Sequence, residues 1–359
     1  MVVPSLAFAA LLAQAEPAPL PAPFTPRVTP YGFINFQYSR TDATSPKADT
    51  STFEFRRARI GLKGDLTPQV GFNIVYDGAD SSLKDAYAAL KYLPGVEVRL
   101  GQLKTPFGYE QPEADTRLLW LYNSYAVAAL ARGRDSRDEG VLVSGKWRMG
   151  DLLAVDVAAA GVNGAGPSAK DDLVEKTLWG RAGLSLSLAG TTTRLGGSYG
   201  HGHQVQSTGA DARFGVQGSG GSATLDDTYF YFHAAGADLT FDSPWVFVAA
   251  EWVQSRRHVA RYTAPAASTV TDVTPKGWYV GAYGKTPWGL GPVLRVEEAR
   301  LVTSAGTTLA ADWNRRYTVG AYYDVRPVNA RLVLNYERDA SPTVVRTGDR
   351  FIALAQVIF

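Results

Sequence analysis

Four cationic side chains stand close together in the segment 53–66, FEFRRARIGLKGDL. Guanidinium and ammonium groups bind carboxylates and phosphates, so a row of them indicates either an anion-handling surface or a set of ion pairs. A β-strand places alternate residues on opposite faces. Three cations occupy one parity and three apolar residues the other: Arg57, Arg59 and Lys63 against Ala58, Ile60 and Leu62. The segment therefore predicts a strand with one apolar and one cationic face.

Arg56 departs from this alternation, because it shares the parity of the apolar residues. If that face contacts lipid, Arg56 must lie near a rim, where its long side chain can reach the headgroups. The cations could instead pair with acidic residues of neighbouring strands, such as Glu54, Asp65, Asp77 or Asp85. Pairing within the wall and ion handling in a channel are both consistent with the sequence.

The composition narrows the class of protein. The chain has 359 residues, a formal net charge of +2 and no cysteine. The small net charge disfavours a general nucleic-acid-binding protein, and the absence of cysteine excludes thiolate metal sites and cysteine nucleophiles. Apart from the first residues, no apolar run approaches the roughly 20 residues that a membrane-spanning helix requires.

The N-terminus predicts export. An apolar run over residues 2–13 leads into Ala13-Gln14-Ala15, a small-x-small pattern suited to signal peptidase. We predict a signal peptide over residues 1–15. Residues 16–30 contain six prolines, which favour an extended periplasmic spacer. We place the folded domain at residues 31–359.

From Tyr31 onward the dominant pattern is alternation of apolar and polar residues over segments of about ten residues. Clear examples are YGFINFQYSR (31–40), QVGFNIVYD (69–77) and LKDAYAALKY (83–92). At about 20 residues per strand and connection, the chain predicts about 16 strands, an even number that can close an antiparallel ring. No long helical pattern is present to cover an open sheet, so the sequence predicts an all-β fold, an antiparallel barrel.

Alternation alone does not say which face is outside. A soluble barrel turns its apolar face inward, whereas an outer-membrane barrel turns it toward lipid and keeps polar residues in the lumen. Strands of about ten residues match a tilted membrane span, and aromatic residues recur at segment ends, as in Tyr76, Trp147 and Trp245. The chain also ends on Phe359 after an alternating segment, FIALAQVIF. These features favour a transmembrane barrel, with Phe359 as its assembly signal.

One connection is much longer than the others. Residues 103–139 contain Pro106 and Gly108, a mildly apolar middle and then a cluster of arginines and aspartates. A connection of this length usually has a function. We predict that it folds into the lumen and places cations at a constriction, where they select anions; the predicted residues are Lys104, Arg117, Arg132 and Arg134. The alternative is an external loop with solvated charges.

The sequence resembles the phosphate-selective porin O and P family. The segments that carry the resemblance are FRRARIGLKGDL (55–66), LKDAYAALKYLPG (83–95), RLGQLKTPFGYE (99–110), RGRDSRDEGVLVSGKW (132–147), GVNGAG (161–166), GADLTF (236–241), AAEW (249–252) and the terminal Phe strand. The resemblance implies a 16-stranded, usually trimeric barrel whose pore carries anions. It also implies pore-lining roles for Arg57, Arg59, Lys104 and the arginines of RGRD, with Asp85 as partner of a lumen lysine.

Other motifs are weaker. HGHQ places His201 and His203 two residues apart, a spacing that could supply two metal ligands, but no third ligand is evident. The glycine-rich segment near residues 218–222 lacks a following GKS or GKT, so it predicts a loop and no phosphate cradle. We predict no metal site and no cofactor.

The leading functional hypothesis is passive diffusion of small hydrophilic solutes through an outer-membrane channel, biased toward anions such as phosphate. The predicted partners are outer-membrane lipid, small anions, the barrel-assembly machinery and two further copies of the chain, with no nucleic acid. The alternatives are a non-selective porin, a barrel enzyme that uses Ser198 and His201, and a soluble β-binding protein.

Overall fold

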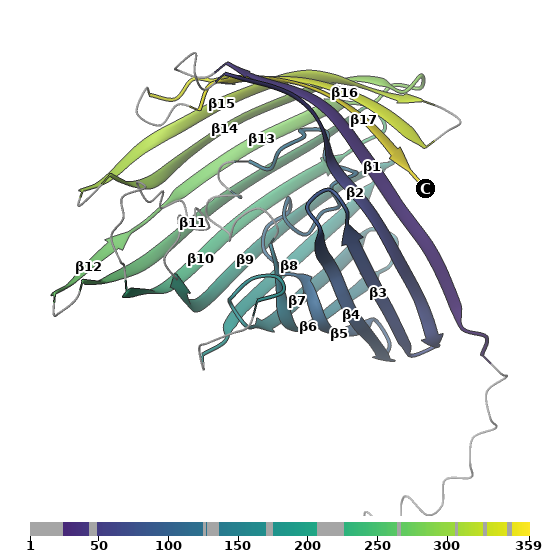
Figure 1. The fold of residues 1–359 in the computed structure, drawn as a ribbon. Coiled ribbons are helices and arrows are strands. Elements are labelled where there is room, and N and C mark those ends of the chain that lie inside the picture. The colour runs from purple at the N-terminus through teal and green to yellow at the C-terminus, as the bar shows by residue number, and fades with distance from the viewer. Residues whose placement is uncertain are drawn as a thin grey trace, which may run out of the picture.

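The computed structural model describes residues 24–42, 49–124, 127, 136–169, 175–206, 226–263, 267–305, 308–325, 329–342 and 347–359, with side chains left undescribed at 203–206, 226–231, 257–273 and 301–312. The described residues form strands that pair in sequence order around a ring (Figure 1). Their bounds are β1 (Arg27–Asp42), β2 (Thr50–Thr67), β3 (Val70–Asp77), β4 (Ser82–Leu93), β5 (Val96–Lys104), β6 (Arg137–Met149), β7 (Leu153–Val162), β8 (Thr177–Leu188), β9 (Thr191–Gln206), β10 (Asp226–Asp242), β11 (Val246–Thr263), β12 (Ala267–Val273), β13 (Lys276–Gly284), β14 (Leu290–Ala305), β15 (Thr308–Val325), β16 (Ala330–Asp339) and β17 (Asp349–Ile358).

The ring closes between its first and last strands. β1 pairs antiparallel with both β2 and β17, and Figure 1 shows the yellow C-terminal strand beside the purple N-terminal one. β12 and β13 occupy successive halves of one position in the ring, because both pair with β11 and only Thr274 and Pro275 separate them. The predicted 16-stranded antiparallel barrel is therefore confirmed.

The barrel is apolar outside and polar inside. On β16, Asn335 and Glu337 are buried, whereas Leu332 and Leu334 are each half exposed. This is the reverse of a soluble core, and it places the aliphatic row where lipid can solvate it. Within the described residues, no helix is long and apolar enough to cross a membrane.

The two ends of the barrel differ in their connections. At one end, here called the turn end, short connections such as residues 94–95 and 189–190 join the strands, and both termini of the barrel lie there. At the opposite end, the loop end, some strands are much further apart in sequence: β5 ends at Lys104 and β6 begins at Arg137, and β9 ends at Gln206 and β10 begins at Asp226. In outer-membrane barrels short turns face the periplasm and long loops face outward.

The first strand starts earlier than the sequence predicted. β1 begins at Arg27, four residues before the boundary at Tyr31, and Arg27 pairs with Asp65 of β2. β2 is long enough to pair with this extension of β1. Pro30 lies within the extension and interrupts the pairing only by lacking its own backbone N–H donor. The predicted signal peptide, residues 1–15, lies outside the described residues.

Candidate functional site: a loop-constricted lumen

The connection that follows β5 turns back into the barrel. Its neck is closed by the Thr105 amide, which donates to the Ser136 carbonyl at 2.8 Å. Gly108 has a φ of +68°, and a Cβ there would lie 1.7 Å from Oε1 of Glu251 on β11. The Gly108 amide donates to Ser198 Oγ on β9 at 2.9 Å. Only glycine allows this left-handed turn and this close approach, so the loop meets the inner wall directly.

Aromatic side chains hold the loop against the wall. Phe107 packs edge-on against Trp179 of β8, with ring centroids 5.4 Å apart. Trp120 packs against Tyr279 of β13 at 6.1 Å, over Gly281, where a Cβ would lie 2.8 Å from the indole ring. Phe107 and Trp120 are almost fully buried. The loop is thus folded into the lumen, as predicted, and is not an external loop with solvated charges.

A buried ion network anchors the far part of the loop. Arg295 of β14 donates to the Tyr122 carbonyl at 2.6 Å, and the same nitrogen lies 3.7 Å from Glu110 Oε1. Glu110 also accepts from the Ser124 amide at 3.0 Å, which ties two parts of the loop together. Burial raises the pKa of Glu110 above its usual value, and the charge of Arg295 partly offsets this.

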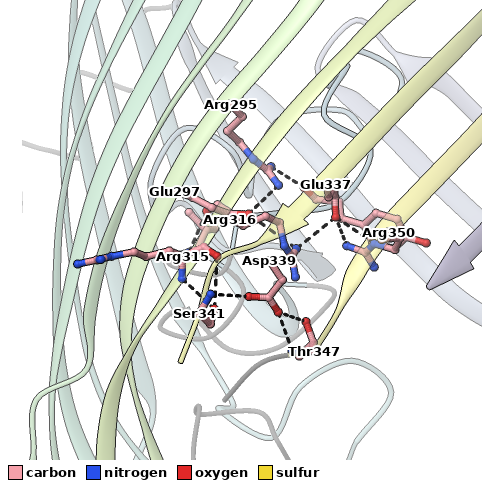
Figure 2. Close-up of polar contacts among 12 residues, drawn as sticks. Arg295, Glu297, Arg315, Arg316, Glu337, Asp339, Ser341, Thr347 and Arg350 are labelled. Carbon is pink, nitrogen blue, oxygen red and sulfur yellow. Dashed lines mark hydrogen bonds and ion pairs between the residues drawn. The ribbon is translucent and has the colours of Figure 1, made fainter. Parts of the chain in front are cut away.

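The network continues along the wall toward β17. Arg295 contacts Glu297 at 3.1 Å, Arg316 of β15 lies 3.7 Å from Glu297 and 3.5 Å from Glu337, and Arg350 donates to Glu337 at 3.0 Å. Figure 2 shows these side chains converging on one surface of the wall. Each carboxylate of this network, Glu110, Glu297 and Glu337, has a cation beside it, because a solitary charge would be costly to bury.

Arg56 corrects the sequence prediction. A β-bulge lies in β2 where the register shifts between Asn35 and Phe36 of β1, and Arg56 is the residue that the pairing skips. The bulge turns Arg56 inward with Arg57, so it does not reach toward lipid headgroups as expected. Its guanidinium lies 4.3 Å from the Tyr122 ring centroid, and Arg350 lies 3.7 Å from it. Two guanidinium groups therefore hold one loop tyrosine.

The space beside the loop is lined mainly by the wall from β2 to β9. A cavity of about 920 Å³ contains eight Lys or Arg side chains and five Asp or Glu side chains in its lining. The basic residues are Arg59, Lys91, Arg99, Lys104, Arg137, Lys146, Arg181 and Arg194, and the acidic ones are Asp85, Glu97, Glu113, Asp115 and Asp156. Its lining is therefore cationic overall.

Two further cavities extend this space. One of about 1190 Å³ shares Tyr109, Glu113, Lys146 and Arg194 with the first and reaches the turns near Trp245. Another of about 450 Å³ lies at the turn end of β1 to β5 and shares Lys91 and Arg99 with the first. The shared residues make the three cavities parts of one lumen on the periplasmic side of the loop.

Arg57 and Arg59 lie in the lumen and contact the loop through one carboxylate. Arg57 lies 3.1 Å from Asp115, and Arg59 lies 2.5 Å from Asp115 and 2.9 Å from Asp77 on β3. Burial would raise the pKa of Asp115, but Arg57, Arg59 and Lys104 outweigh it and hold the pKa well below its usual range. The two arginines therefore do both things that the sequence allowed: they face the lumen, and they pair with carboxylates.

The remaining predicted residues separate into different parts of the lumen. Lys104 donates to the Glu113 carbonyl at 2.5 Å and lines the 920 Å³ cavity. Arg117 is 75% exposed beside Glu113 and lines the second cavity. Lys63 lies near the turn end, 4.9 Å from the Tyr31 ring, so it stands away from the constriction. Arg132 and Arg134 lie outside the described residues.

Asp85 pairs with an arginine instead of the expected lysine. Its two carboxylate oxygens accept from Arg137 of β6 at 3.0 and 3.1 Å. Phe359 closes the ring, since its amide donates to Gly32 at 3.0 Å and its carbonyl accepts from Gly32 at 2.8 Å. Its role as an assembly signal stays a prediction.

Sequence reasoning missed several basic residues of the lumen. Lys91, Arg99, Lys146 and Arg194 line cavities and are more exposed than Arg59 or Arg137. Lys91 carried a usable signal, because it shares the parity of Asp85 on a strand with an apolar opposite face. Arg99 carried the same signal, because Glu97 and Arg99 alternate with Val96, Val98 and Leu100.

The closed barrel, its inverted polarity and its inward-folded loop define an outer-membrane porin, a channel for small solutes in the bacterial outer membrane. The model of the phosphate-selective porin O and P family matches residues 28–287. The chain belongs to this family. Among curated proteins no relative matches the chain.

Solved outer-membrane proteins share the fold at low sequence identity. OmpT of Vibrio cholerae, solved in a trimer form, has a TM-score of 0.58 and 11% identity over 94% of this chain and 100% of its own. OmpF of Salmonella typhi in complex with daunomycin has a TM-score of 0.57 and 15% identity over 92% and 97%. The channel DcaP of Acinetobacter baumannii has a TM-score of 0.51 and 15% identity over 93% and 97%.

Proposed function

We propose that the channel passes small hydrophilic solutes by diffusion and favours anions such as phosphate. The observation that carries this proposal is the excess of basic over acidic side chains around the 920 Å³ cavity. Fixed cations in a narrow, low-dielectric passage raise the local concentration of anions and repel cations. In a non-selective porin, the carboxylates that pair with these basic side chains would have to cancel the excess positive charge.

The anion bias is carried by cations that contact the water of the lumen. Arg99, with its partner Glu97 at 2.5 Å, is 37% exposed, and Arg194, with Asp156 at 2.5 Å, is 29% exposed. Arg59 and Arg137 are buried in ion pairs and add less to the field that a passing solute meets.

Chloride and phosphate reversal potentials across planar bilayers test the proposal. The variant R99Q/K146Q/R194Q removes three basic charges from the cavity and should lower the anion-to-cation permeability ratio by about threefold or more. R338Q is the control, because Arg338 lies on the outer face of β16. Cation preference in the wild-type channel, or an unchanged ratio in the triple variant, would contradict the anion bias.

Catalysis has weaker support. Ser198 lies on the lumen side of β9 and accepts from Gly108, whereas His201, three residues later, lies on the opposite face and stacks on His233 at 4.9 Å. The two side chains of the enzyme hypothesis therefore do not meet. We infer that the protein is a channel and no enzyme, and detergent-solubilised protein should show no esterase activity.

We also propose that the chain is exported by a signal peptide over residues 1–15, is recognised by the barrel-assembly machinery through Phe359, and assembles as a homotrimer. The trimer form in which Vibrio cholerae OmpT was solved supports the last point by analogy of fold. Light scattering of the detergent-solubilised protein would give the number of subunits.

A further inference from the structure

All four histidines of the chain lie on three neighbouring strands, although they are far apart in the sequence. His201 and His203 are on β9, His233 is on β10 and His258 is on β11, and Figure 1 shows these strands side by side. The pairing of β10 with β9 places His233 directly opposite His201. On the next level toward the loop end, Tyr231 of β10 pairs with His203 on one side and with His258 on the other. Strand register therefore gathers the four histidines into one small area.

This area belongs to the outer face of the barrel. On β9, Tyr199 is 52% exposed and Ser198 is buried, and His201 has the parity of Tyr199. On β10, Ala234 is buried on the lumen side, so the adjacent His233 faces outward. The histidines therefore stand outside the pore, and they have no part in the channel described above.

The outer surface becomes polar at this level. On β11 the successive outward-facing residues toward the loop end are Ala250, Trp252, Gln254 and Arg256. An exposed tryptophan followed by polar residues marks the membrane interface. Because Arg256 pairs with His233, the histidines lie beyond the level of Trp252, where dissolved ions can reach them from outside the cell.

His201 and His233 are already arranged as a pair of imidazoles. Their ring centroids lie 4.9 Å apart. Two imidazoles that share a tetrahedral Zn²⁺ ion, each at about 2.0–2.1 Å, have ring centres about 5 Å apart. His203 is the diagonal neighbour of His233, and backbones in that relation are about 7–8 Å apart, a distance that long side chains can bridge.

A neighbouring tyrosine orients the ring of His233. The hydroxyl of Tyr199 and Nδ1 of His233 form a hydrogen bond of 2.6 Å. A histidine that binds a metal through Nε2 carries a proton on Nδ1 and donates it to an outer acceptor, which fixes the orientation of the ring. The Tyr199 oxygen can accept this bond. The two ring nitrogens point in divergent directions, so Nε2 is directed away from Tyr199 and toward the loop end.

We propose that His201, His203 and His233 bind a divalent transition-metal ion such as Zn²⁺ on the outer face of the barrel, with Tyr199 as a positioning residue. The spacing of His201 and His203 offered two ligands, and the strand pairing adds His233 as the third. His203 is placed by its strand register. Three imidazoles and a water molecule are a frequent ligand set for zinc, whereas Mg²⁺ and Ca²⁺ prefer oxygen ligands.

The neighbouring charges place the ion on the β9 side of His233. Arg256 of β11 lies opposite His233 on the other side, and its positive charge repels a dication from there. His258 is two strands away from β9 and lies directly opposite Asp272 of β12. His258 is therefore a neighbour of the site and not one of its ligands.

Titration calorimetry with zinc chloride tests the proposal. The full-length protein, without a polyhistidine tag, is purified in neutral detergent, treated with a chelator and titrated. The wild type should bind a single Zn²⁺ per chain, and Mg²⁺ should not compete. The variant H201A/H203A/H233A should bind Zn²⁺ more weakly by about 100-fold or more, because losing only the outer partner of a ligating histidine already costs about 10–100-fold.

Three further variants separate a defined site from a general affinity of surface histidines for metals. H258A keeps the proposed ligands and should bind Zn²⁺ like the wild type. Y199F removes only the hydroxyl group that orients His233 and should weaken binding by about 10-fold. Y317F, which alters another exposed tyrosine of the outer face, is the matched control and should leave binding unchanged. Heat-modifiable migration on a gel reports that each variant is folded.

Equal zinc affinity in the wild type and H201A/H203A/H233A would overturn the proposal. An equal loss in H258A would also overturn it, because the ion would then lie between β10 and β11. Unchanged affinity in Y199F would overturn the positioning role of Tyr199. Calorimetry measures no current, so none of these results depends on the ion selectivity of the pore.

Discussion

Two parts of the inner wall are similarly rich in charge and use it differently. On the cavity side, from β2 to β9, basic residues such as Lys91, Arg99 and Arg194 border open space. On the docking side, Arg295 and Arg316 of β14 and β15 are buried with their carboxylates beneath the loop. An arginine in this lumen therefore acts on solutes only where the loop leaves it in contact with water.

The loop is the element that makes the two walls different. It packs over β11 and β13 to β17 through Tyr122, Trp120 and Glu110, and it leaves much of the wall from β2 to β9 facing the cavity. The buried charges on the docking side stabilise the fold, because removing the partner of a buried charge costs free energy. Those on the cavity side can lose a partner to water at little cost.

The substitution Arg295→Met should have the largest effect on this arrangement. It leaves Glu110 and Glu297 buried without their common cation and costs about 3–5 kcal/mol. We expect the loop to leave the wall and single-channel conductance to rise. Arg99→Met removes an arginine from the cavity side and should leave the loop in place. An unchanged conductance in R295M would mean that the ion network does not hold the loop.

Gly108→Ala should displace the same loop from its other end. The new Cβ would collide with Glu251, and the left-handed backbone adds about 1–2 kcal/mol. Gly150→Ala is a matched control, because Gly150 has a φ of +69° but nothing within 4 Å of the added Cβ. Both variants should lower the unfolding midpoint, and only G108A should change conductance. Identical single-channel currents in the two variants would show that Gly108 does not determine the position of the loop.

Asp115→Asn should produce a smaller change, in selectivity. It removes the carboxylate shared by Arg57 and Arg59, so the cavity side becomes more cationic and the anion preference, measured as a reversal potential, should rise by about twofold. Asp151→Asn, at an exposed turn, is the control. A fall in anion preference in D115N would show that the pairing, and not the net charge, governs permeation.

The lowered pKa of Asp115 predicts how ion selectivity depends on pH. Because its pKa in the folded protein is lowered, its ion pairs stabilise the loop above the unfolded value of about 3.9 and are lost as the pH falls through the lower folded value. Asp115 should therefore still be ionised at about pH 4, and the difference in anion preference between the wild type and D115N at pH 7 should persist at that pH. Loss of this difference at pH 4 would indicate an ordinary carboxylate.

The sequence alone determined the strand pattern and the closed barrel, because a period of two and the lack of covering helices leave few other ways to satisfy backbone groups. The outward direction of the apolar face was predicted from strand length, the aromatic residues at segment ends and the terminal strand. The sequence also located the long loop and placed Arg57 and Arg59 in the lumen. The sequence did not predict that Arg56 points into the lumen. This orientation depends on a β-bulge, which shifts the alternation of inward and outward residues and leaves no clear signal in a single sequence.

Only the tertiary structure decided which lumen charges meet water. Arg99 and Arg295 are similar in sequence terms, since each stands in an alternating strand beside a glutamate two residues away. The loop covers Arg295 and leaves Arg99 open. That difference arises from contacts between residues more than a hundred positions apart, and the physical role of a charge depends on the dielectric around it, which those contacts set.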